Sequence, residues 1–307
     1  GLAATGIRGI RFVHELQGFY DVTINDWSEE AFKVIKKNIE KKRFKNIHCT
    51  NLNVNQLVLQ QNYDYIDVDP FGSPVSFIDA AIQSIRHHGV LAVSATDTAT
   101  LCGVYPIVCK RRYAATPFHG PVMHEVGLRI LLGYVAREAA KHDKGVVPIF
   151  SYKIDHYMRL YVHIFRNIAS ANETASQIQT LFSSKLFPFQ QEKEKIIGPL
   201  WTGQLHSKQI VTQISKIVLE KEFGTKKRMM KLLGLFIEES EAPLFYYTTN
   251  DLASLLHCSP PRLDRLWDVF HKHDIPIFKT QFDPTGFKTT ASFQEVKNIF
   301  LESCNTE

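Results

Sequence analysis

Short apolar runs alternate with amphipathic segments through the first half of the chain. Four apolar runs that read as strands lie at 19–24, 47–50, 63–68 and 90–94. Helical periodicity separates them, most clearly over 29–42 and 76–86. This alternation is typical of a parallel sheet whose strands are joined by crossover helices. We therefore predict a doubly wound α/β fold for this part of the chain.

Small residues open the sequence. Ala3, Ala4, Thr5 and Gly6 lead into an amphipathic segment that begins near Ile10 and is expected to be helical. A strand normally precedes such a loop in a parallel sheet, whereas the sequence begins at Gly1. We therefore expect the first strand of the sheet to lie outside the sequence.

The pattern changes in the second half. Residues 167–197 are rich in Ser, Gln and Asn, which predicts a linker or insertion. Four helical segments are then expected at 207–222, 229–239, 252–256 and 261–272, with a strand over 275–282. We predict an α/β domain over 1–166, the linker over 167–197 and a smaller α+β domain over 198–307 whose end resembles a winged helix.

Composition narrows the class of protein. The 307 residues are 44% hydrophobic, and no run of about 18 apolar residues or secretion signal is visible, so we expect no membrane partner. Five scattered cysteines form no C-x-x-C pair, which argues against a disulfide framework and a zinc ribbon. The 36 basic residues exceed the 31 acidic ones by 5, which permits nucleic-acid binding without requiring it.

Polar residues stand where the predicted strands end. Ligands of open parallel sheets bind beyond these carboxyl ends, so the residues there are candidates for a site. Thr5-Gly6 lies in the first loop, Asp26 ends the second strand and Asn53 follows the third. An acid at the position of Asp26 suits ribose hydroxyls, although it is equally typical of a helix cap or turn.

The fourth strand ends in the most distinctive motif, Asp69-Pro70-Phe71-Gly72. Asp69 can hold or remove the proton of an exocyclic amine, and Phe71 can stack on a base that has left its helix. Asp-Pro is also a common turn dipeptide, so the motif alone leaves a plain turn open. Its place after an apolar strand favours chemistry.

Several blocks resemble, in the same order, segments of the tRNA guanine-26 N2-dimethyltransferase family. They are Ala4–Arg8, Asn25-Asp26, Asp69–Pro74, Thr96–Gly103, His124–Leu131, Gly198–Gly203, Phe245–Tyr247, Ser259–Pro261 and Thr285–Thr289. The resemblance implies a Rossmann-like domain that uses S-adenosylmethionine, and a C-terminal domain that helps to bind tRNA. It also implies an intracellular place, the nucleus or nucleolus foremost and the mitochondrion as an alternative.

Site residues follow from this resemblance position by position. It implies cofactor contacts from Thr5, Gly6, Arg8, Asp26, Asn53 and Val54. It implies a reacting centre of Asp69, Pro70 and Phe71. Basic side chains are candidates for phosphate contacts, or are simply solvated: Lys110, Arg111, Arg112, Arg262, Arg265, Lys279 and Lys288.

Two positions depart from the family's pattern. Asn53 stands where an aspartate is usual, and it lacks the charge. Residues 187–197 contain no cysteine where many members have a zinc-binding pair, so we expect no metal. Both departures are typical of a divergent eukaryotic paralogue. They leave open a tRNA-binding protein with weak or no catalysis, acting as chaperone or regulator, and an enzyme that acts on a neighbouring guanosine.

Overall fold

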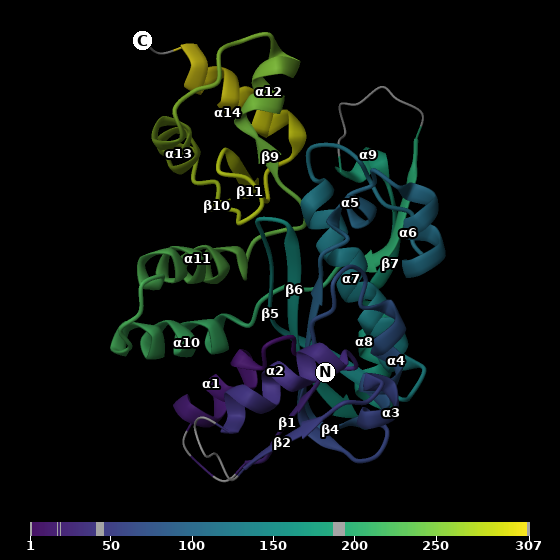
Figure 1. Cartoon of the computed structure of the whole chain (residues 1–307). Helices are drawn as coiled ribbons and strands as arrows, with labels where there is room; N and C mark the ends of the chain where they lie inside the picture. Colours follow the sequence, from purple (N-terminus) through teal and green to yellow (C-terminus); the bar gives the residue numbers. More distant parts are fainter. Residues whose placement is uncertain (1, 17, 19, 41–45, 187–193, 306–307) are drawn as a thin grey trace. The chain divides into compact units, whose positions relative to one another are not determined.

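The computed structural model describes residues 2–16, 18, 20–40, 46–186 and 194–305. The chain divides into two compact units, which are described separately below (Figure 1). Unit 1 comprises residues 1–97, 138–147 and 161–174. Unit 2 comprises residues 98–137, 148–160 and 175–307.

Helices and strands alternate through the start of unit 1, as predicted. The elements are α1 (Ile7–Glu15), β1 (Val22–Asn25), α2 (Glu29–Glu40), β2 (Ile47–Thr50), α3 (Val54–Val58), β3 (Tyr63–Val68), α4 (Val75–Ser84) and β4 (Ile85–Ala95). β1 pairs with β2 and β3 pairs with β4, both in parallel. The α/β prediction is therefore confirmed. Residues 41–42, predicted as the end of a helix, lie outside the described residues.

Two further strands complete the sheet that contains β3. They are β5 (Lys144–Ile154) and β6 (Tyr157–Arg166), and the strand order is β3-β4-β6-β5. β1 and β2 form a separate two-stranded sheet among the described residues. The expectation of an additional first strand stays a prediction.

A buried lysine caps α4. The Nζ atom of Lys144 donates to the backbone oxygens of Ile82, Gln83 and Ile85, at 2.5, 2.9 and 3.1 Å. The first two carbonyls belong to the last turn of α4 and the third to Ile85, the residue that follows it, and a cation at this end of a helix is favoured by the helix dipole. Burial lowers the pKa of Lys144, and the three carbonyls compensate for the water that its ammonium group loses. Lys144 thereby fixes the point at which α4 passes into β4.

The segment predicted to be a linker or insertion contains regular structure. Residues 167–197 include α8 (Ile168–Ser176), β7 (Ile178–Phe182) and α9 (Ser183–Leu186), and they enter β8 (Ile196–Trp201). β7 pairs antiparallel with β8 in unit 2. The polar composition reflects strands and helices with one exposed face, as the exposed Gln179 and Thr180 beside the buried Leu181 show.

Unit 2 begins with three helices, and its last hundred residues contain two groups of elements. The helices are α5 (Thr98–Leu101), α6 (Pro106–Tyr113) and α7 (Met123–Ala140). The first group is the antiparallel pair α10 (Lys208–Glu220) and α11 (Lys226–Glu239), which pack through Val211, Val218 and Leu233. The second group is a module of β9 (Tyr247–Thr248), α12 (Thr249–Leu256), α13 (Leu263–Lys272), β10 (Ile277–Lys279), β11 (Gly286–Thr289) and α14 (Phe293–Asn305).

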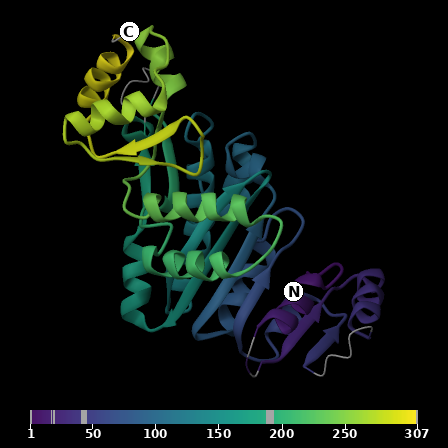
Figure 2. The same cartoon turned by 90° about the vertical axis from the view of Figure 1, so that its left-hand side faces the viewer.

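The module has the helix-and-sheet composition of the smaller α+β domain. Its strands form an antiparallel sheet in the order β10-β11-β9. Figure 2 shows its helices gathered on one side of that sheet. Leu266, Phe270, Phe287 and Phe300 form its buried core. The predicted fold class, with a smaller α+β part towards the C-terminus, is thereby confirmed, while the domain bounds 198–307 stay a prediction. α14 is an addition to the predicted elements.

Candidate active site

The Asp-Pro-Phe-Gly turn presents an aromatic ring to solvent. Pro70 is buried, whereas Phe71 is 100% exposed, which is unusual for a large apolar side chain. Gly72 holds the turn at a positive φ of 92°, its N–H donates to Thr96 Oγ1 at 2.6 Å, and its carbonyl accepts from the Thr96 N–H at 3.0 Å. These two hydrogen bonds hold the turn against the end of β4. The ring of Phe71 is exposed because of the conformation that they fix.

Arg8 joins the first loop to the end of β3. Its Nη2 atom lies 2.7 Å from Asp69 Oδ2, and its Nη1 atom donates to Asp67 Oδ2 at 3.0 Å. The Tyr65 hydroxyl donates to the same Asp67 oxygen at 3.2 Å. A residue predicted to bind the cofactor thus meets the predicted acid-base residue. Tyr65 and Thr96 position this site although neither was among the predicted site residues. Thr96 opens the block Thr96–Gly103 of the family resemblance, whereas for Tyr65 only its place in a predicted strand could have indicated the role.

Asp26 anchors the first loop. It is 8% exposed, its Oδ2 atom accepts the Ala4 N–H at 2.9 Å, and its Oδ1 atom accepts the Ser28 N–H at 3.0 Å. Gly6 has a positive φ of 72°, and a Cβ atom there would lie 3.2 Å from both Ile24 and Ile35. Glycine is therefore needed where the loop turns into α1. Asp26 and the loop form one rigid corner.

Asn53 acts as the N-cap of α3. Its Oδ1 atom accepts the Asn55 N–H at 2.9 Å, and its side chain is exposed. Val54, the first residue of the helix, is 5% exposed. Asn25 orders this edge from β1, because its Oδ1 atom accepts the Leu52 N–H and its Nδ2 atom donates to the Leu52 carbonyl, both at 3.0 Å. The predicted adenine contact of Asn53 and Val54 stays a prediction.

Most of the predicted RNA contacts lie on the surface. Lys110, Arg111 and Arg112 are exposed on α6. Lys279 is exposed on β10, and Arg262 is exposed and paired with Asp264 at 2.6 Å. Arg265 is half-buried. These residues belong to different elements of unit 2 and are far apart in the sequence. The sequence alone therefore does not show whether they form one RNA-binding surface.

Lys288 is a correction to these predictions, because it is 1% exposed and cannot reach a phosphate. Its Nζ atom lies 2.9 Å from Glu125 Oε1 and 3.1 Å from Glu239 Oε1. Glu125 also pairs with the buried Arg129 at 2.9 Å. The positive charges of Lys288 and Arg129 therefore neutralise the negative charges of Glu125 and Glu239 inside unit 2. Lys288 binds α7 and α11 to β11 instead of binding RNA.

His206 completes this buried cluster. Its Nδ1 atom accepts the Ser151 N–H at 3.4 Å, and its Nε2 atom lies 3.5 Å from Glu239 Oε2 and 3.0 Å from Gln281 Nε2. Burial lowers the pKa of His206, so the ring is held neutral. Burial by itself raises the pKa of Glu239, but Lys288 and the hydrogen bonds from His206 and Thr280 outweigh it and keep the carboxylate charged.

The described residues contain no group of three or more histidine, cysteine or acidic side chains arranged to hold a metal ion. Within the same residues, no helix has the length and apolar character needed to cross a membrane. Part of the cysteine-free segment discussed above, 187–193, lies outside the described residues.

Parallel strand pairs joined by helices, with an acidic corner after β1 and an Asp-Pro-Phe turn after β3, place unit 1 in the class of Rossmann-like methyltransferases. The chain belongs to the N2,N2-dimethylguanosine tRNA methyltransferase family, whose model matches residues 1–301. The family inferred from the sequence blocks is thereby confirmed.

Solved and curated relatives support the same placement. A tRNA (guanine(26)-N(2))-dimethyltransferase of Thermococcus kodakarensis is 37% identical over 97% of this chain and 85% of its own length. One of Pyrococcus horikoshii is 34% identical over 98% of this chain and 84% of its own. The structure of Trm1 from Pyrococcus horikoshii with S-adenosyl-L-methionine superposes with a TM-score of 0.89, at 32% identity over 97% of this chain and 86% of that one.

Proposed function

We propose that this chain transfers methyl groups from S-adenosylmethionine to the exocyclic amino group of a guanosine in tRNA. The observation that carries the proposal is the pairing of Asp69 with Arg8 beside a fully exposed Phe71. The relatives named above are tRNA (guanine(26)-N(2))-dimethyltransferases, which supports a guanosine at position 26 as the target.

The corner around Asp26 fits this cofactor. A carboxylate has about four acceptor positions, and the N–H groups of Ala4 and Ser28 occupy one on each oxygen. The remaining positions suit the two hydroxyls of a ribose. Arg8 is the cation at the entrance of the same loop, suited to the carboxylate of the methionine part. When bound, S-adenosylmethionine supplies a methyl group on a positively charged sulfur.

Asp69 and Phe71 have different roles toward guanine: Asp69 accepts the amine proton, and Phe71 holds the base. The amine lone pair of guanine is conjugated with the ring, so the nitrogen is a weak nucleophile until its proton is held or removed. Asp69 accepts that hydrogen bond and takes the proton as the new N–C bond forms and the C–S bond breaks with its electron pair on sulfur. Phe71 stacks on the base, and the clamp to Thr96 keeps its ring in place. Positioning of this kind supplies much of the rate.

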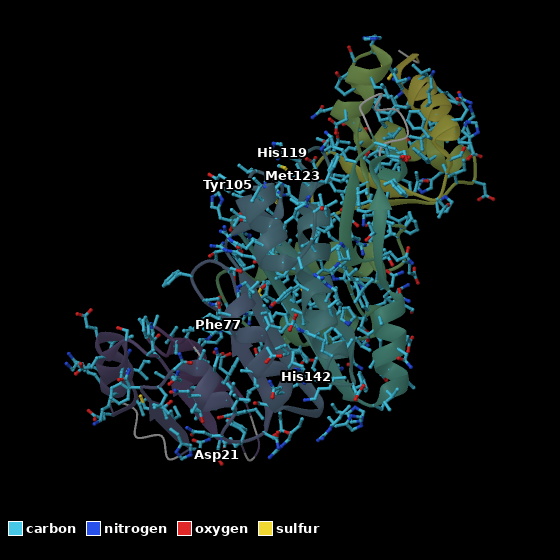
Figure 3. The ribbon with its side chains drawn as sticks, turned by 90° about the vertical axis from the view of Figure 1, so that its right-hand side faces the viewer. Asp21, Phe77, Tyr105, His119, Met123 and His142 are labelled. Carbon is cyan, nitrogen blue, oxygen red and sulfur yellow. The ribbon has the colours of Figure 1, made fainter. Side chains whose placement is uncertain are left out.

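The α6 surface supports tRNA as the partner. We define this surface as Val104, Tyr105, Ile107, Lys110, Arg111 and Arg112, all exposed. The sequence holds no acidic residue between Asp97 and Glu125, so the cations of this surface outnumber the acids of their own segment. Tyr105 directly precedes α6 and is labelled in Figure 3. His119, labelled in the same view, has its Nδ1 atom 3.1 Å from the Cys102 carbonyl oxygen. Cations beside an exposed aromatic ring suit phosphates and an unstacked base.

The first test compares Asp69→Asn with the unchanged chain. Unmodified tRNA is incubated with the purified protein and methyl-labelled S-adenosylmethionine, and the nucleosides are then analysed. We expect N2-methylated guanosine with the unchanged chain. In the variant the rate of methyl transfer should fall by about 10²- to 10⁴-fold, because the carboxylate that accepts the amine proton is lost. Asp64→Asn is the matched control, since Asp64 is also on β3 and also pairs with an arginine, Arg86, at 2.8 Å.

Two further measurements separate the outcomes. A tRNA with adenosine at position 26 tests the target, and it should lose all incorporation if the proposal is right. Binding of S-adenosylmethionine and of tRNA is measured directly. Binding of both without any methylated guanosine would instead indicate the non-catalytic tRNA-binding protein, and incorporation into the position-26 variant would indicate a neighbouring guanosine.

A further inference from the structure

Two cysteines meet in the C-terminal module. The Sγ atoms of Cys258 and Cys304 are 3.2 Å apart although 46 residues separate them in sequence. Cys258 follows α12, and Cys304 lies in the last turn of α14. Both are free thiols, and both are partly accessible to solvent. The contact is separate from the site around Asp69, and the proposed methyl transfer makes no use of it.

Neighbouring groups make this pair a defined site. Cys304 Sγ donates to the Ser259 carbonyl at 3.3 Å, which directs its lone pairs elsewhere. Arg265 has a buried Nη2 atom without a hydrogen-bond partner among the described residues, and its charge acts on Cys304. A buried guanidinium nitrogen is a ready partner for a negatively charged sulfur or oxygen. Burial and the contact with Cys258 nevertheless raise the pKa of Cys304 to about 12.

We propose that Cys258 and Cys304 are a modification site that hydroperoxides convert into an intramolecular disulfide. The Cys258 thiolate attacks the peroxide, the O–O bond breaks, and a sulfenic acid forms on Cys258 with release of an alcohol or water. Cys304 Sγ then attacks this sulfur, its proton passes to the departing hydroxide, and water leaves. Two thiols lose two electrons, and the hydroperoxide gains them. The sulfurs must approach by only about 1 Å to reach the bonded distance.

This closure has physical consequences for the module. The disulfide would join the end of α12 to α14 and enclose α13, β10 and β11 in one loop. Closing a loop of this length restricts the unfolded chain, so the thermal midpoint of the module should rise by about 10 °C and fall back with a reductant. Because the pKa of Cys304 is raised, formation should be slow at neutral pH and faster as the pH increases.

The experiment treats the purified full chain with hydrogen peroxide, blocks remaining thiols and maps peptides without reduction. The expected result is a linked peptide pair that contains Cys258 and Cys304, absent from Cys258→Ser and Cys304→Ser. Cys49→Ser is the matched control, since Cys49 is also half-buried but has no sulfur contact among the described residues, and it should leave the linkage unchanged. Sulfinic acids at either position without linkage, or unreacted pair thiols under conditions that oxidise Cys49, would overturn the proposal.

Discussion

A single lysine bridges two glutamates in the interior of unit 2. Lys288 contacts Glu125 and Glu239, and all three side chains are at most 1% exposed. At the level of one residue, this burial decides between two roles that a sequence cannot separate. From sequence alone, Lys288 is expected to be solvated or to bind phosphate, because its neighbours Phe287 and Thr289 give no sign of the acids that contact it from α7 and α11.

We predict that Lys288→Met destabilises the chain by about 3 to 5 kcal/mol, because it removes the lysine that pairs with the buried Glu239 and leaves Arg129 as the only basic partner of Glu125 among the described residues. Unfolding in urea, followed by fluorescence, measures the change. Lys279→Met is the control, since Lys279 is exposed on β10, and it should change stability by less than about 0.5 kcal/mol. Equal midpoints for the two variants, with a selective loss of tRNA affinity in Lys288→Met, would restore the RNA-binding role.

At the same scale, the sequence is enough to single out the Asp69-Pro70-Phe71 turn, whose role as the reacting centre stays a prediction, but it does not show the contacts that hold this turn. Asp69, Pro70 and Phe71 stand out because an acid, a proline and an aromatic follow an apolar strand. The residues that fix them act over long sequence distances, such as Thr96 on Gly72 and Arg8 on Asp69. Those contacts depend on which strand ends meet, so local sequence does not contain them.

Among the elements, the sequence pattern located the short apolar strands of the first half better than the strands of the second half. β2 and β3 fall at the predicted residues, since both are short apolar runs between turn signals. β6 was not predicted, although Met158, Leu160, Val162 and Ile164 are buried and alternate with polar residues. Its partner order β4-β6-β5 follows from tertiary pairing. The polar composition of 167–197 predicts a linker, whereas short elements with one exposed face, such as β7, form there, because composition does not reveal their periodicity.

The buried cluster that joins α7, α11, β10 and β11 should make stability sensitive to acid. His206 is held neutral in the folded chain, while the unfolded chain binds a proton below the ordinary pKa of 6.5. The unfolded state therefore gains protons first as the pH falls. His206 contributes its full stabilisation above pH 6.5 and loses it progressively below, by up to about 1.4 kcal/mol per pH unit.

His206→Gln tests this expectation. The informative quantity is how steeply the free energy of unfolding changes with pH, and not its value at one pH. Urea midpoints are compared from neutral pH down to about 5.5, where titration of Glu239 does not yet intervene. The variant should show a shallower decline than the unchanged chain. His48→Gln is the control, because His48 is 62% exposed, and it should keep the full slope. Parallel slopes for all three proteins would mean that His206 is not held neutral.

For the whole molecule, the excess of basic residues matters less than its distribution. The net charge of +5 is modest for 307 residues, and many cations are neutralised locally, such as Lys33 by Glu29 and Lys208 by Glu241. Lys110 and Arg111 have no ion pair within the part of the chain that the structure describes, and the sequence around them contains no acid. A polyanion such as tRNA gains most from such uncompensated charges.

We therefore predict that the double variant Lys110→Gln/Arg111→Gln weakens tRNA binding and reduces its salt dependence. Each phosphate contact releases counterions, so loss of two contacts should lower the slope of log affinity against log salt by about 1.5. Filter binding across a salt series measures the slope. Lys33→Gln/Lys208→Gln removes the same charge from ion-paired positions and should leave the slope nearly unchanged. If both double variants lower it equally, net charge and not the α6 surface governs binding. If neither does, tRNA is bound elsewhere.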